Sequence, residues 1–200
     1  MDTTHLQVID QLDFRNNRKQ LIGSYVLRFS GVFFFGLFFQ YLLNVVRGEF
    51  SLTTLGSIEI EGVAAVWSII LLVLNIVLVL CLHELVHAAV YYFSSRQTPL
   101  IGMRGLVIFA AAPDKLISRN VMLINALAPV FIFSLLGFGL MLNVPEQALA
   151  WVFIPTLVNA AASGGDFMVV YFVLKHNPQT QYRDVGDIIS ALESWPVMKQ

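Results

Sequence analysis

Apolar residues fall into four long runs that are separated by shorter polar stretches. The runs cover residues 21–46, 63–93, 121–142 and 148–174. About 20 apolar residues are enough for a helix to cross the hydrocarbon core of a bilayer, so each run predicts one transmembrane helix. Pro129 and Pro155 lie inside the last two runs, and each predicts a kink in its helix.

Two segments outside these runs have weaker patterns. Short apolar stretches broken by Gly102 and Gly105 lie within residues 98–113, and they favour either a β-hairpin or an amphipathic loop near the membrane surface. Residues 184–195 predict a short amphipathic helix on the membrane surface. We therefore predict an all-α membrane protein with four transmembrane helices, and with a short β-hairpin or interfacial segment between the second and third helices.

Composition supports an integral membrane protein with a single domain over residues 1–200. Of the 200 residues, 57% are hydrophobic and 12% are charged, and a soluble domain carries roughly twice that charged fraction. The net charge of −1 and the lack of a basic stripe argue against a nucleic-acid partner. The first twenty residues are polar and the first apolar run is long, so we expect no cleavable signal peptide.

Charges in the loops predict the orientation in the membrane. The segments before the first run, between the second and third runs, and after the fourth run are basic, whereas the other two loops hold a single basic residue, Arg47. Because basic loops stay on the cytoplasmic side, both termini are expected in the cytoplasm, with residues 175–200 as a cytoplasmic tail.

The second run contains His83, Glu84 and His87 in the pattern His-Glu-x-x-His. On a helix, residues four apart share a face, so the two imidazoles can bind one metal ion, and Glu84 can take a proton from a metal-bound water. A charge near the bilayer centre costs about 2.5–3.5 kcal/mol, which makes ionisable residues in a span functional candidates. The alternative is a polar patch of hydrogen-bonded histidines where the helix leaves the membrane.

A zinc hydrolase usually has three protein ligands, and Asp166 is the best candidate for the third. It is the only acidic residue of the fourth run, and it lies nine residues before Lys175, or about 13 Å along a helix, a depth similar to that of Glu84. The other two histidines, His5 and His176, lie in polar segments and are more typical of solvated side chains.

Three polar residues of the last two runs have two interpretations each. Asn159 and Ser163 share a helix face with Asp166 and either assist catalysis or form hydrogen bonds between packed helices. Asn125 in the third run either supports a developing oxyanion or forms an interhelical hydrogen bond.

These residues resemble a family of small bacterial membrane proteins described as zincin peptidases and, more distantly, the site-2 protease group of intramembrane metalloproteases. The resemblance rests on His83-Glu-Leu-Val-His87, Ala128-Pro129, and Asn159 followed by Ser-Gly-Gly-Asp166. It implies one zinc ion held by His83, His87 and Asp166, Glu84 as the catalytic base, and assistance by Asn159. It also implies a bacterial cytoplasmic membrane. The site-2 group's aspartate lies in a Leu-Asp-Gly sequence, whereas Asp166 follows two glycines.

We therefore predict a membrane-embedded zinc metallopeptidase that hydrolyses peptide bonds of membrane or membrane-proximal substrates. Its partners are the peptide substrate and the lipid bilayer, and the sequence does not indicate an oligomeric state. Two rival functions share the metal site. One is a non-catalytic metal-binding scaffold or chaperone, and the other is a transporter that uses intramembrane His and Asp.

Overall fold

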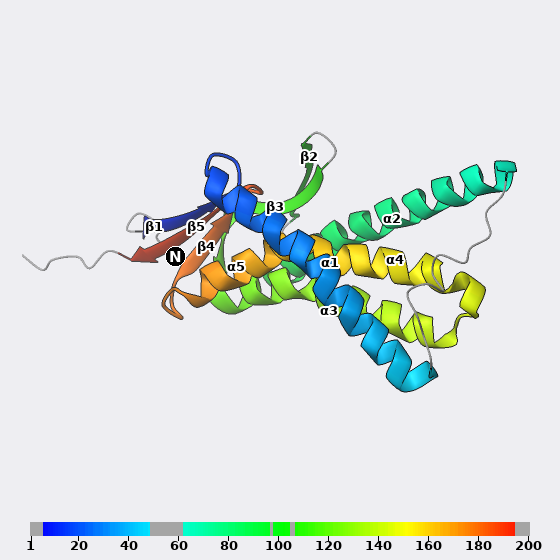
Figure 1. Cartoon of the computed structure of the whole chain (residues 1–200). Coiled ribbons are helices and arrows are strands. Elements are labelled where there is room, and N and C mark those ends of the chain that lie inside the picture. The colour runs from blue at the N-terminus through cyan, green and yellow to red at the C-terminus, as the bar shows by residue number, and fades with distance from the viewer. Residues whose placement is uncertain (1–5, 49–61, 97, 105–106, 195–200) are drawn as a thin grey trace, which may run out of the picture. The chain divides into compact units, whose positions relative to one another are not determined.

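The computed structural model describes residues 6–48, 62–96, 98–104 and 107–194 (Figure 1). The chain divides into two compact units. The sheet unit contains the described parts of residues 1–25, 84–128 and 166–200, and the helical unit contains those of residues 26–83 and 129–165. The boundary between the two units falls inside several helices, and the prediction of a single domain stays a prediction.

The predicted transmembrane helices are present. They are α1 (Arg18–Arg47), α2 (Gly62–Ser95), α3 (Arg119–Asn143), and a fourth segment formed by α4 (Glu146–Ala162) and α5 (Gly164–Leu174). All four segments are long and apolar enough to cross a membrane. The fourth was predicted as one continuous helix, but Ser163 ends α4 and two glycines begin α5. Glycine is a poor helix former, which accounts for a break at this point.

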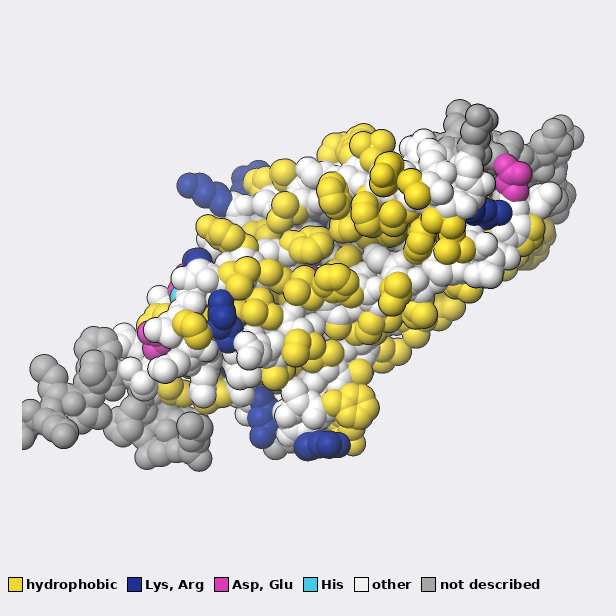
Figure 2. Space-filling model, turned by 90° about the horizontal axis from the view of Figure 1, so that it is seen from below, with side chains coloured by type: hydrophobic (Ala, Val, Ile, Leu, Met, Phe, Trp, Pro, Cys, Tyr) yellow, Lys and Arg dark blue, Asp and Glu magenta, His cyan; other side chains and the backbone are white. Residues whose placement is uncertain are grey.

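Hydrophobic side chains cover much of the molecular face seen in Figure 2. On α1 several large ones are strongly exposed, among them Phe29, Phe34 and Tyr41. A soluble protein rarely leaves so many exposed, whereas lipid accepts them without cost. The surface of the helices therefore agrees with their predicted place in a bilayer.

Small residues allow the helices of the helical unit to approach closely. A Cβ atom built on Gly31 of α1 would lie 3.2 Å from the Cα of Ala161, and one on Gly137 of α3 would lie 2.1 Å from Oγ1 of Thr156. Transmembrane helices commonly pack through such residues, since apolar side chains gain little by leaving lipid for one another.

Replacing Gly137 by Ala will destabilise the protein, by about 1–3 kcal/mol. Thr156 cannot move aside easily, because it is buried and its hydroxyl donates to the carbonyl of Val152 at 2.7 Å. Gly139→Ala is the matched control, since nothing lies within 4 Å of a Cβ at that position. Thermal unfolding of both variants in detergent measures the difference, and equal stability of the two would contradict this packing.

The sheet unit corrects the predicted all-α class. The protein is mostly helical, but five antiparallel strands form one sheet in the order β1-β5-β4-β3-β2. The strands are β1 (Leu6–Asp13), β2 (Leu100–Arg104), β3 (Val107–Ser118), β4 (Gln181–Asp184) and β5 (Ile188–Ser194). The antiparallel pair of β2 and β3 lies where a hairpin was one of the two predicted alternatives.

The predicted surface helix over residues 184–195 is wrong, because most of this segment is strand β5. Ile189 and Ala191 are buried, in keeping with the two-residue period of a strand. They join a core with Leu12 of β1 and Tyr182 of β4, to which α2, α3 and α5 contribute Tyr91, Met122 and Phe172. The sheet is thus packed on the ends of helices that carry the candidate site.

Candidate metal centre

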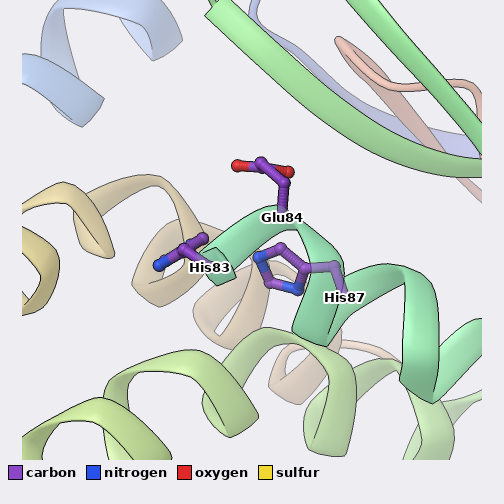
Figure 3. Close-up of side chains that lie close together, drawn as sticks. All are labelled: His83, Glu84 and His87. Atoms are coloured by element: carbon purple, nitrogen blue, oxygen red, sulfur yellow. The ribbon is translucent and has the colours of Figure 1, made fainter. Parts of the chain in front are cut away.

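His83, Glu84 and His87 lie on one continuous stretch of α2 (Figure 3). One ligand atom from each of the three side chains can be chosen so that all lie within 4.8 Å of one another. Both histidines are buried, with 5% and 7% of their surface exposed. The spacing predicted from the sequence therefore brings the three groups close enough together that they could hold a metal ion.

The ring of His83 is oriented by Asn159 of α4. Nδ1 of His83 lies 2.9 Å from Oδ1 of Asn159, whose side chain is fully buried. The amide nitrogen of Asn159 lies 3.5 Å from the carbonyl oxygen of Pro129, which agrees with the amide oxygen facing the histidine. Because an amide oxygen only accepts, Nδ1 of His83 donates, and the lone pair is on Nε2.

The ring of His87 is oriented by a main-chain group. Its Nδ1 lies 2.9 Å from the carbonyl oxygen of Asn125 on α3. A carbonyl oxygen can only accept, so Nδ1 of His87 carries the hydrogen and the lone pair is again on Nε2. Zinc-binding histidines commonly use their second nitrogen in this way, which fixes both the tautomer and the ring orientation.

Asp166, at the start of α5, lies beside the nitrogen of His87 that carries the lone pair. Its Oδ1 is 3.5 Å from Nε2 of His87. Two ligand atoms that are each about 2 Å from a tetrahedral zinc ion are about 3.3 Å apart. The distance between Asp166 and His87 is therefore compatible with both atoms binding one zinc ion, and carboxylate oxygens and imidazole nitrogens are both zinc donors.

Glu84 points toward strand β3. Its Oε2 accepts a hydrogen bond of 3.2 Å from the backbone N–H of Ala110. The hairpin was one of two alternatives predicted for residues 98–113, and its strand β3 contacts the carboxylate that was predicted to be the base.

A second buried polar pair lies one helical turn beyond His87, and the sequence analysis missed it. The hydroxyl of Tyr91 donates to Oδ2 of Asp184, and the N–H of Gly186 donates to Oδ1 at 2.7 Å. Burial raises the pKa of Asp184 to about 6. The four-residue spacing of His83, His87 and Tyr91 was the available signal. The pair ties strand β4 to the helix that carries the candidate ligands.

The remaining candidates of the sequence analysis are His5, His176, Ser163 and Asn125. His176 contacts the carbonyl of Phe172 and the carboxylate of Asp10, whereas His5 lies outside the described residues. The hydroxyl of Ser163 donates to the carbonyl of Asn159 within the same helix segment. The Oδ1 atom of Asn125 is buried, and among the residues described it has no hydrogen-bond partner.

Comparison with known proteins gives one match. A family model described as "Putative zincin peptidase" matches residues 76–182, which is more than half of the chain. The matched region includes all three side chains of the α2 group and Asp166. Neither the curated proteins nor the solved structures gave a match.

Proposed function

The chain belongs to the family described as "Putative zincin peptidase", and on this premise we propose that it is a membrane-embedded zinc metallopeptidase. In this proposal His83, His87 and Asp166 hold one zinc ion per chain. The observation that carries it is the hydrogen bonding of the two histidines, because each donates from Nδ1 and so keeps the lone pair of Nε2 for a metal.

Glu84 is the proposed general base. A zinc ion held by these residues would supply a water of lowered pKa and would polarise a substrate carbonyl. Glu84 takes the proton from the water and passes it to the leaving amine. Asn159 was predicted to assist catalysis, and its contact with His83 supports assistance through the orientation of that ring.

The proposed substrates are peptide segments in the membrane or next to it. The proposed ligands and base lie on two of the four segments that are long and apolar enough to span a membrane, so a substrate must reach them from lipid or from the membrane surface. The basic loops support access from the cytoplasmic side of a bacterial membrane. Residues 107–111 of β3 pair with β2 on one side, whereas the pairing with β4 begins only at Ala112. The side of this stretch that faces Glu84 suits an extended peptide, which can pair with a strand through its backbone.

Reconstitution in liposomes tests this function. The zinc-loaded protein is mixed with a panel of peptides that each contain one hydrophobic segment, and the products are identified by mass spectrometry. We expect cleavage that stops on removal of zinc by a chelator and returns when zinc is added. A protein that binds zinc but cleaves nothing in the panel would favour a scaffold, and zinc flux into the liposomes would favour a transporter.

A further inference from the structure

We propose that Pro129 is a positioning residue for His87, because it leaves the main-chain carbonyl of Asn125 able to accept a hydrogen bond from the imidazole. The proposal rests on the proposed function only in taking His87 as a metal ligand. Pro129 thereby has a role in addition to the kink that the sequence predicts.

The argument starts from the hydrogen bonds of an α-helix. Each carbonyl accepts from the N–H four residues later, and the residue four positions after Asn125 is Pro129, which has no N–H. The proline ring also pushes the carbonyl four residues earlier away from its usual direction. The carbonyl of Asn125 is therefore both without its helical donor and able to turn toward a neighbouring helix.

The donor that the helix lacks is supplied by His87. Its Nδ1 lies 2.9 Å from this oxygen, and both His87 and Asn125 are buried. A buried carbonyl without a partner is costly, so the contact satisfies the carbonyl and fixes the histidine tautomer at once. The acceptor is a carbonyl of the main chain, so it cannot become a donor and allow the other tautomer.

The same arrangement, in which a side chain of α2 donates to a carbonyl that a proline has left without its helical donor, occurs a second time. It is an independent observation. Pro155 of α4 removes the helical donor of the Trp151 carbonyl, and this oxygen accepts a hydrogen bond of 2.8 Å from Nδ2 of Asn75. Thus two prolines in two helices each leave a carbonyl that a polar side chain of α2 occupies. Only one of these side chains, His87, belongs to the candidate metal group.

Pro129→Ala is the direct test. Alanine restores an N–H that competes for the carbonyl of Asn125 and removes the ring that turns the carbonyl outward. We expect zinc affinity to fall about 10–100-fold, the usual effect of losing a group that orients a metal ligand. Pro155→Ala is the matched control, because it makes the same change at another buried proline, and its zinc affinity should equal that of the wild type.

The tautomer itself is measured in the metal-free protein by NMR of ¹⁵N-labelled histidine rings. The chain has only four histidines, and the signal of His87 is assigned by its loss in His87→Gln. We expect Nδ1–H in the wild type, in Pro155→Ala and in Asn125→Ala, which keeps the main-chain carbonyl. We expect Pro129→Ala to shift toward Nε2–H.

Three results would overturn the proposal: an unchanged ring and zinc affinity in Pro129→Ala, equal losses in both proline variants, or an Nδ1 of His87 that carries no hydrogen in the wild type. Should Pro129→Ala not fold, the wild-type and Asn125→Ala spectra decide. A hydrogen on Nδ1 of His87 in both proteins supports the main-chain carbonyl of Asn125 as its partner. Loss of this hydrogen in Asn125→Ala would overturn the proposal. The spectra need neither zinc nor a substrate, so they remain informative if the proposed peptidase activity fails.

Discussion

Replacing Glu84 by Gln will lower the rate of peptide hydrolysis by about 10²–10⁴-fold and leave zinc binding unchanged. That range is typical for the contribution of a general base. The Gln side chain has the same shape, and its oxygen can still accept from the N–H of Ala110, so the local structure is kept. It cannot take a proton from water at neutral pH.

Glu146→Gln provides the control for this variant. Glu146 is exposed at the start of α4, so the same chemical change there should leave hydrolysis at the wild-type rate. Rates are compared at equal zinc occupancy, measured by elemental analysis. Wild-type activity in Glu84→Gln would remove Glu84 from the mechanism, whereas loss of zinc together with activity would make it a ligand.

Replacing Asp166 by Ala will weaken zinc binding by at least about 100-fold. Removing a group that only supports a ligand already costs 10–100-fold, so removing a ligand should cost more. The basis is the 3.5 Å distance from Oδ1 of Asp166 to Nε2 of His87. Competition with a chromophoric chelator measures the affinity in detergent.

Asp114→Ala is the control for Asp166→Ala, since Asp114 is an exposed carboxylate on strand β3. Its zinc affinity should match that of the wild type. Unchanged affinity in Asp166→Ala would mean that the third ligand is another group, although the two histidines would remain candidates.

The helices could be predicted from the sequence because twenty apolar residues in a row have few alternatives. Apart from the pair of β2 and β3, which was one of two predicted alternatives, the sheet could not be predicted, because its strands carry weak patterns. Half of the side chains of β1 are exposed, and Leu12 is its one fully buried residue. Strand β5 has only seven residues, and its short amphipathic pattern also fits a surface helix. Whether such a segment forms a strand depends on its pairing with strands that are distant in the chain. The local sequence pattern carries no information about that pairing.

The candidate site could likewise be predicted only in part from the sequence. The spacing of His83, Glu84 and His87 is a property of one helix, so the sequence was enough to group them. Asp166 was predicted from its depth in the fourth span, and the structure places it beside His87. The partner of His87 is a main-chain carbonyl, which no side-chain pattern reveals. The sequence predicted only a kink at Pro129. The packing of α2 against α3 shows which group accepts a hydrogen bond from His87.

The most direct test of the central claim is X-ray absorption at the zinc edge of the purified wild-type protein, together with its zinc content. We predict one zinc per chain with two imidazole nitrogens at about 2.0–2.1 Å, completed by oxygen ligands. Failure to bind zinc after reconstitution would contradict this account. So would a sulfur ligand at about 2.3 Å, which would place the metal at Cys81, the sole cysteine.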